Sequence, residues 1–264
     1  ETMSSADIKL AADIDMTGFE LKPVSGTEKV SVITAGEYYS GGAYTGTFDG
    51  QGHMITNLVM DRTNKYVDGG MDERADAVGG LFGYTAGAVI KDLGIEGEIK
   101  VTDACGGSGG NYLHIGGIAG FAQRGTKISG CSADMDITMK VATYTNSSGK
   151  TVVKGHPEIC DTFIGGITGS MSTISTVSET KIENCWSRGR YYGEGTRTVS
   201  TGGITGSTRS GNNVISRCYS SASIEVDADI YASSGQASYL GGIAGKVNAV
   251  STAEKAPDIS YCFA

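Results

Sequence analysis

Residues 116–120 read Gly116-Gly117-Ile118-Ala119-Gly120, a block of the form Gly-Gly-x-x-Gly. The block occurs five times, and its copies begin at Gly79, Gly116, Gly165, Gly202 and Gly241. These starts lie 37, 49, 37 and 39 residues apart, which is the spacing of an internal repeat. A single block of this kind could cradle a phosphate, but no helix-forming segment follows any of the five. The blocks therefore indicate a repetitive architecture rather than a nucleotide site.

The composition narrows the class of protein further. Glycine makes up 41 of the 264 residues, about 16%, which is roughly twice its usual share. Collagen is excluded because there are only 3 prolines and no three-residue period. A net charge of −8 without a basic run argues against a nucleic-acid partner. No apolar stretch approaches the roughly 20 residues that a membrane span needs.

A second motif follows each glycine block and consists of isoleucine, two further residues, and then cysteine or leucine. Its copies are Ile90–Leu93, Ile128–Cys131, Ile182–Cys185, Ile215–Cys218 and Ile259–Cys262, with an earlier sixth copy at Ile55–Leu58. Residues three apart in a strand point to opposite faces, so two buried residues at this spacing require a corner between them. Four copies carry a residue suited to a left-handed corner, namely Asn57, Asp92, Gly130 and Asn184.

Apolar and polar residues alternate after each corner. The inward set of one repeat is predicted to run from Cys131 through Ala133, Met135, Ile137 and Met139 to Val141. This period of two is typical of strands with one wet face. Because the same positions recur once per repeat, we predict an all-β fold in which successive coils stack in parallel.

The repeats resemble a known family. The glycine blocks resemble the GLUG motif, the segment 46–58 resembles the phrase that precedes such repeats, and residues 10–15 resemble the strand that opens these regions. Such regions occur in bacterial surface proteins, including adhesin-like proteins of Bacteroidetes and non-catalytic parts of immunoglobulin-A peptidases. The resemblance implies one right-handed parallel β-helix domain over residues 1–264, with about five to six coils. Residues 1–45 are expected to cap it and residues 46–264 to form the coils, with an insertion around residues 144–157.

Two structural columns are expected from the stacking. Cys131, Cys185, Cys218 and Cys262 share one repeat position, which would hold neighbours about 4.8 Å apart with parallel side chains. A disulfide needs Cβ atoms nearer about 3.8 Å, so we predict a reduced, buried ladder. The second glycines of the blocks should superpose in a second column, formed by Gly80, Gly117, Gly166, Gly203 and Gly242.

The two remaining cysteines differ from this ladder. Cys105 and Cys160 precede consecutive glycine blocks and have no counterpart in the other repeats. In an extracellular protein such a pair favours a disulfide, and we predict one between them.

Catalytic patterns are hard to find in this chain. His53, His114 and His156 lack metal-ligand spacing, and no nucleophile elbow of the form Gly-x-Ser-x-Gly is followed by its partners. We therefore expect no catalytic residue, no metal and no cofactor.

One outward column next to the cysteines is rich in aromatic residues. It is predicted to read Val59, Gly94, Ser132, Trp186, Tyr219 and Phe263. Aromatic faces suit sugar rings, so Trp186, Tyr219 and Phe263 are candidate residues for binding a glycan or a protein. Three further candidates flank them, namely Arg188, Arg190 and Tyr192. The alternative is that a loop or another domain covers the column.

Charged residues fill the next two outward columns. These columns are Glu96, Asp134, Arg188 and Ser221, and then Glu98, Asp136, Arg190 and Ser223. We interpret them as an ion-pair network on a solvated face. The alternative is that the acids bind calcium or act as an acid and base pair.

These observations favour a non-enzymatic module that is displayed outside the cell, on the bacterial surface or secreted, for adhesion or recognition. Its expected partner is a glycan or a protein, and further domains are expected in the full-length protein. The alternative is a polysaccharide-acting enzyme, a lyase or hydrolase, because fold does not assign function. An ice-binding surface is disfavoured because only Thr196 and Thr198 alternate as such an array requires.

Overall fold

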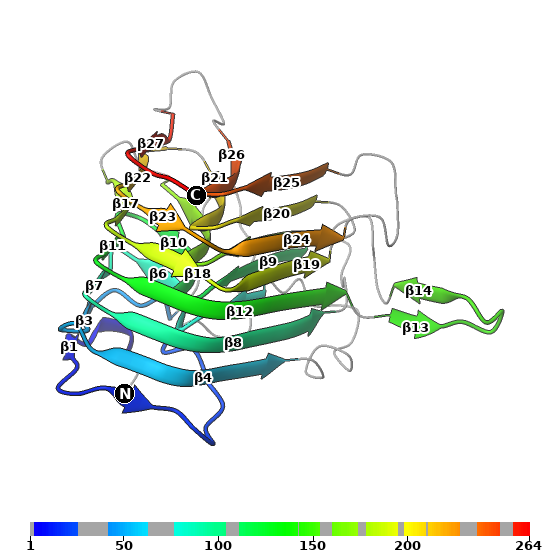
Figure 1. The fold of residues 1–264 in the computed structure, drawn as a ribbon, viewed down its shortest axis with the longest axis horizontal. Coiled ribbons are helices and arrows are strands. Elements are labelled where there is room, and N and C mark those ends of the chain that lie inside the picture. The colour runs from blue at the N-terminus through cyan, green and yellow to red at the C-terminus, as the bar shows by residue number, and fades with distance from the viewer. Residues whose placement is uncertain are drawn as a thin grey trace.

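The protein is an all-β molecule built from parallel sheets (Figure 1). The structure, a computed structural model, describes residues 3–25, 42–62, 77–103, 111–141, 143–153, 160–173, 178–194, 198–209, 211–227, 237–248 and 256–264. Across these ranges the only helical element is a 3-10 turn at Met3–Ser5. No helix in the same ranges is long and apolar enough to cross a membrane.

Four parallel sheets account for nearly all strands. Sheet A stacks β1 (Ile8–Lys9), β3 (Thr47–Asp49), β7 (Val89–Lys91), β11 (Lys127–Ser129), β17 (Thr180–Glu183), β22 (Asn213–Ser216) and β27 (Asp258–Ser260). Sheet B stacks β2 (Ile14–Asp15), β4 (Met54–Arg62), β8 (Gly94–Asp103), β12 (Ser132–Val141), the pair β18 (Trp186–Arg188) and β19 (Arg190–Glu194), and the pair β23 (Tyr219–Ser220) and β24 (Ser223–Asp227).

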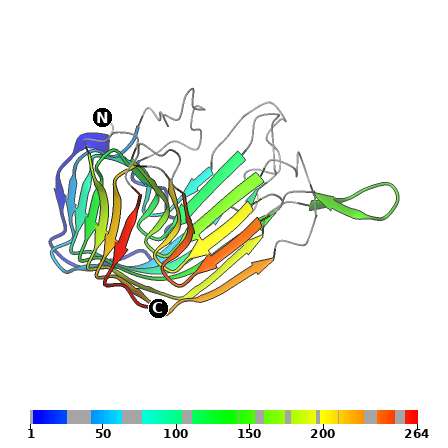
Figure 2. The ribbon, with the colours of Figure 1, turned by 90° about the horizontal axis from the view of Figure 1, so that it is seen from above.

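The glycine blocks join the other two sheets. Sheet C stacks β5 (Ala77–Gly79), β9 (Asn111–Gly116), β15 (Cys160–Gly165), β20 (Thr198–Gly202) and β25 (Ala237–Gly241). Sheet D stacks β6 (Phe82–Ala86), β10 (Ala119–Gln123), β16 (Thr168–Ser172), β21 (Thr205–Arg209) and β26 (Ala244–Val247). Each repeat passes through sheets A, B, C and D in turn, and Figure 2 shows the stacks from above. This arrangement is consistent with the expected β-helix.

The corner predicted between sheets A and B is present. The residue before each cysteine or leucine has a positive φ, at Asp92, Gly130, Asn184, Arg217 and Tyr261, with values between 51° and 62°. Arg217 and Tyr261 adopt this conformation although their residue types do not favour it. The stacked neighbours therefore impose the corner even where the local sequence does not.

The proposed sixth copy of the corner motif, Ile55–Leu58, is wrong. Phe48, not Ile55, pairs with Ile90 in sheet A, whereas Ile55 pairs with Ile95 in sheet B. Asn57 does have a positive φ of 56°, but it lies at an irregularity inside β4, between Ile55 and Leu58. Spacing alone could not separate a corner from a bulge, because both use a left-handed residue between buried neighbours.

The three glycines of the block at residues 165–169 each lie close to a different segment of backbone. A Cβ on Gly165 would overlap the carbonyl oxygen of Thr168 across the tight turn from sheet C to sheet D. A Cβ on Gly166 would lie 2.5 Å from the carbonyl oxygen of Gly203 in the next coil. A Cβ on Gly169 would overlap the backbone of Ile115, because sheet D packs directly on sheet C. The Gly-Gly-x-x-Gly pattern therefore occurs where the backbone lies close to other backbone segments in three directions, which leaves no room for a Cβ.

The glycine column holds for four of its five predicted members. Gly117 N–H donates to Gly166 O at 3.0 Å, and Gly166 N–H donates to Gly203 O at 3.0 Å. A Cβ on Gly203 would in turn overlap the carbonyl oxygen of Gly242. Gly80 departs by one residue, because Gly79 pairs with Ile115 rather than with Gly116. The register recovers where Phe82 pairs with Ala119.

The interior has two layers. The main core contains Ile90, Ile128, Ile182 and Ile215 of sheet A together with the inward apolar residues of β8 and β12, all of them buried. A second layer between sheets C and D contains Val78, Tyr84 and Phe121. His114 also lies there, stacked on Phe163 with ring centroids 5.1 Å apart, and its Nδ1 lies 2.8 Å from the Ser170 hydroxyl. Burial lowers the pKa of His114 to about 3, so this histidine is a neutral core residue.

Two parts of the described chain lie outside the regular coils. The N-terminal segment adds β1 to sheet A and β2 to sheet B, and Glu20 forms a bridge with Val59. An antiparallel hairpin of β13 (Thr143–Thr145) and β14 (Thr151–Val153) projects from the stack within the predicted insertion (Figure 1). Pro157 lies outside the described residues, so the end of the insertion is not assigned.

The four ladder cysteines have free thiols. Cys131, Cys185 and Cys218 are buried, and Cys262 is half-buried. Each thiol faces the carbonyl oxygen two residues earlier, across the corner, with S···O distances of 3.2–3.3 Å. A weak thiol donor at the corner is something that leucine cannot supply. Cys105 and the side chain of Cys160 lie outside the described residues, so the disulfide between them stays a prediction.

The ladder predicts a graded reaction with an alkylating reagent. In the folded protein we expect Cys262 to be modified, whereas Cys131, Cys185 and Cys218 should react only after unfolding. Burial raises the pKa of the Cys262 thiol, so its reaction should be slow near neutral pH and faster in alkali. Peptide mapping by mass spectrometry measures each site. Equal labelling of Cys185 and Cys262 in folded protein would contradict the ladder.

Candidate functional site

The aromatic column lies on the outer face of sheet B. Trp186 pairs with Tyr219, and Tyr219 forms a bridge with Phe263, so the three rings occupy successive coils. Their centroids are 6.0 Å and 5.2 Å apart and the rings are nearly parallel, at 13° and 5°. The first predicted member is wrong, because Met54 and not Val59 pairs with Gly94. The irregularity inside β4 causes this difference.

The geometry of these rings does not make a flat platform. Each ring stacks on the next, so the face of one ring covers the face of its neighbour. The guanidinium of Arg188 lies over the Trp186 ring, with Cζ 5.6 Å from its centroid. Among these rings Phe263 is 69% exposed and Tyr219 is 38% exposed. Where the structure describes it, the column therefore presents mainly ring edges, because stacking covers the faces between neighbouring rings.

Arg188 forms the ion pair that the columns predict. Its Nε donates to Asp134 Oδ2 at 2.7 Å, and its Nη2 lies 2.5 Å from the same oxygen. Asp134 raises the pKa of this guanidinium through that hydrogen bond. Arg188 is therefore occupied on two sides, by Asp134 and by the indole.

Arg190 does not form the corresponding pair with Asp136. Gly189 has a φ of 122° and interrupts the strand between β18 and β19. The freed backbone N–H of Arg190 donates to Asp136 Oδ1 at 2.9 Å, so that carboxylate serves the backbone. Within the described part of the chain, the Arg190 guanidinium makes no hydrogen bond or ion pair. The ion-pair network predicted for the second column is therefore replaced by a backbone contact.

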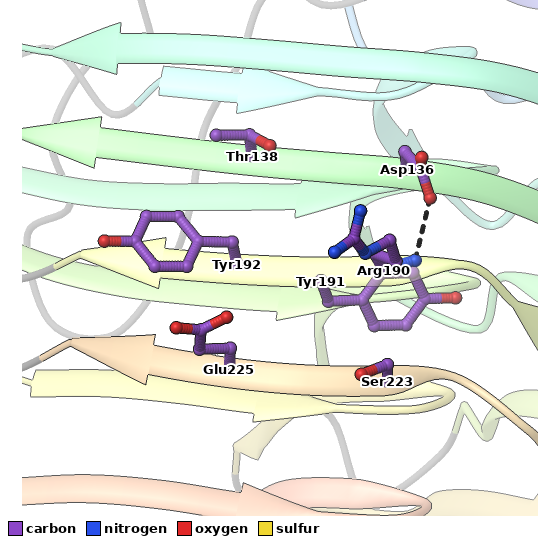
Figure 3. Close-up of a pocket in the computed structure, with 7 residues that line it drawn as sticks. All are labelled: Asp136, Thr138, Arg190, Tyr191, Tyr192, Ser223 and Glu225. Atoms are coloured by element: carbon purple, nitrogen blue, oxygen red, sulfur yellow. Dashed lines mark hydrogen bonds between the residues drawn. The ribbon is translucent and has the colours of Figure 1, made fainter.

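The unpaired guanidinium lies in a polar pocket on sheet B. The pocket has a volume of about 210 Å³ and spans β12, β19 and β24. Its lining residues are Asp136, Thr138, Arg190, Tyr191, Tyr192, Ser223 and Glu225. Figure 3 shows two rows across the strands, with Arg190 between Asp136 and Ser223, and Tyr192 between Thr138 and Glu225. Donors, acceptors and an aromatic ring thus surround one open space.

Neighbouring groups hold the tyrosines of the pocket in place. The Tyr192 hydroxyl donates to Glu194 Oε1 at 2.9 Å, and Glu194 Oε2 accepts the backbone N–H of Val141 at 2.9 Å. Burial, together with this carboxylate, raises the pKa of Tyr192, so its phenol stays neutral. Tyr191 points inward and is 1% exposed, which gives the pocket a rigid floor. Glu194 thus fixes the ring of Tyr192 without lining the pocket.

The six predicted ligand-binding residues therefore separate into two groups. Trp186, Tyr219, Phe263 and Arg188 belong to the ladder, whereas Arg190 and Tyr192 line the pocket. Sequence reasoning missed Thr138, Ser223, Glu225 and the positioning residue Glu194 as parts of one site. A signal was available at Gly189, because an isolated glycine within a strand pattern marks a bulge or a close approach.

The alternatives based on metal binding gain no support from the geometry. Nowhere in the described ranges do three His, Cys, Asp or Glu side chains gather closely enough to hold a metal ion. Asp136 and Glu225 do lie on different strands of the pocket, with Arg190 and Tyr192 on the strand between them. His156 and Thr196 lie outside the described residues.

Comparison with known proteins gives one family match. The sequence model of the family described as the GLUG motif matches residues 111–138, which cover β9, β10, β11 and the first part of β12. The chain thus carries a GLUG motif around its second glycine block. No curated protein and no solved structure matches the chain.

Proposed function

We propose that the chain is a non-enzymatic recognition module that acts outside the cell and binds a glycan at the pocket of sheet B. In this proposal residues 1–264 form one right-handed parallel β-helix of five to six coils. Residues 1–45 cap the coils formed by residues 46–264. The GLUG motif at 111–138 supports a surface role, because this motif is found in extracellular-type repeat proteins.

The observation that carries the proposal is the environment of Arg190. Its guanidinium has no ion-pair partner within the described residues, although Asp136 and Glu225 both line the same pocket. Specific ligand sites combine a few fixed polar groups with an aromatic surface. The five donors of Arg190, the hydroxyls of Thr138 and Ser223, and the Tyr192 ring provide that combination. β19 pairs in parallel with β12 on one side and with β24 on the other, which keeps these groups in register and lowers the entropy cost of binding.

Replacing Arg190 with alanine is expected to weaken glycan binding by about tenfold to a hundredfold, because hydrogen bonds to a charged group contribute about 1.5–3 kcal/mol. A glycan array that carries neutral and acidic glycans identifies the bound structure, and calorimetry with that glycan measures the affinity. Denaturant unfolding of both proteins tests whether the fold is intact.

The matched control is Arg188→Ala. This arginine also points outward from sheet B but is occupied by Asp134 and Trp186, so its removal should change the affinity less than threefold. Equal losses for the two variants would place the ligand elsewhere. Protein binding with no response on the array would mean that the module recognises a protein instead.

A second candidate function is hydrolysis or elimination on a polysaccharide. The observation that favours it is the pair of carboxylates, Asp136 and Glu225, on different strands of one pocket. Glycosidases use two carboxyl groups on opposite sides of the scissile bond. Incubating the bound glycan with the protein and measuring new reducing ends decides between the two. Release of ends that stops in both Asp136→Asn and Glu225→Gln would establish an enzyme.

A further inference from the structure

The charge balance of the pocket is informative about its ligand. Two carboxylates, Asp136 and Glu225, line the pocket together with one cation, Arg190. Outside this lining, Lys140 Nζ lies 6.0 Å from the centroid of the Tyr192 ring and Glu194 accepts from its hydroxyl, so the carboxylates still outnumber the cations. Asp136 Oδ1 is used by the backbone of Arg190, so Oδ2 remains to accept from a ligand. Glu225 has no hydrogen-bond or ion-pair partner among the residues that the structure describes. The pocket therefore presents an excess of acceptors that carry negative charge.

From this balance we infer that the pocket holds a neutral sugar ring rather than a uronic or sialic acid, an inference that rests on the proposed function. An acidic sugar could pair with Arg190, but its carboxylate would then stand in the same small space as Asp136 and Glu225. Like charges brought together in this way reduce affinity and select against the acidic ligand.

A neutral ring uses every group that the pocket offers. Its hydroxyls can accept from Arg190 and donate to Asp136 and Glu225, because a hydroxyl is both donor and acceptor. The Tyr192 ring, fixed by Glu194 through its hydroxyl, supplies an apolar surface for the C–H face of the sugar. The volume of about 210 Å³ is smaller than the pockets that take drug-sized ligands, so it fits one sugar unit of a longer glycan.

A pair of polymers with the same sugar backbone and different charge tests the inference. Polygalacturonate carries one carboxylate per sugar unit, and its fully methyl-esterified form carries none. Together with neutral glucan, mannan and galactan, they are titrated into the intact protein by calorimetry at constant pH and salt. We expect at least one of the neutral polymers to bind, and polygalacturonate to bind at least about tenfold more weakly than it.

A charge-neutral variant separates repulsion from shape. Glu225→Gln keeps the size of the side chain but removes one negative charge. We expect it to strengthen the binding of polygalacturonate severalfold relative to the neutral polymer. Glu183→Gln is the matched control, because Glu183 lies in sheet A beside Lys181 and Arg217 and should leave the preference unchanged.

Different outcomes would overturn the neutral-sugar inference and the proposed function of glycan recognition. Preference for polygalacturonate that is lost in Arg190→Gln would overturn the neutral-sugar inference and leave glycan recognition intact. An unchanged preference in Glu225→Gln would also overturn it, because the charge balance would then not decide the ligand. Absence of binding to every polymer and to the glycan array would overturn the proposed function itself.

Discussion

Replacing Gly165 with alanine is expected to lower the free energy of unfolding by about 3 kcal/mol or more, or to prevent folding. The Cβ would lie 2.6 Å from Thr205 Cα and 2.7 Å from Gly206 N in the next coil, besides overlapping the Thr168 carbonyl. All three are backbone atoms of β16 and β21, which have paired strands on both sides, so none can move without shifting its own neighbours. Denaturant unfolding followed by circular dichroism measures the effect.

Gly79→Ala is the matched control for this substitution. Gly79 occupies the same first position of its block, but the nearest atom to its Cβ would be Ile115 Cγ2 at 3.4 Å, an ordinary contact. Neither glycine has a positive φ, so backbone conformation does not distinguish them. We expect a change below about 1 kcal/mol for Gly79→Ala. Similar losses in the two variants would refute the steric explanation of the glycine blocks.

Mild acid is expected to destabilise the protein through His114. Burial lowers the pKa of this histidine from 6.5 to about 3. Between these two pH values the histidine is protonated in the unfolded chain but neutral in the folded chain. The stabilisation from the neutral imidazole is complete above pH 6.5 and is lost progressively as the pH falls toward 3. Between pH 7 and pH 5 the loss should be about 2 kcal/mol.

His114→Phe tests this origin of the pH dependence. A phenyl ring keeps the contacts with Phe121 and Phe163 but cannot titrate, although Ser170 loses a partner. The variant should therefore be less stable at pH 7 and show a flatter profile between pH 7 and pH 5. Both proteins carry His53→Gln, so that the surface histidine beside Asp13 contributes to neither profile. A slope that survives in His114→Phe would assign the acid sensitivity to other groups.

Only part of the candidate site could be predicted from the sequence. The columns of sheet B follow from a fixed register, so the rows that contain Arg190, Tyr192 and Asp136 could be placed from the repeat alone. The hydrogen bonds of these residues could not be predicted in the same way. Gly189 interrupts the strand, and Asp136 therefore accepts from the backbone N–H of Arg190 instead of pairing with its guanidinium. The same register also placed Trp186 next to Tyr219 in one stack, but rings that stack face to face cover each other and do not form the flat platform expected for sugar rings.

Two departures arose where the repeat is least regular. Gly80 is one residue out of its column, and β4 carries an irregularity that moved Met54 into the position expected for Val59. Both lie in the first coils, at the end of the stack that borders the N-terminal segment. Local spacing is a reliable guide only where the coils on both sides have the same spacing.

The sequence by itself determined the all-β class, the parallel stacking, the corners and the reason for the glycine excess. These properties depend on which residues recur at a fixed period, and periodicity is visible in one dimension. The tertiary structure alone decided which outward side chains pair with one another and which remain open, as at Arg188 and Arg190. That outcome depends on angles and distances between strands, and a single glycine changes them without changing the period.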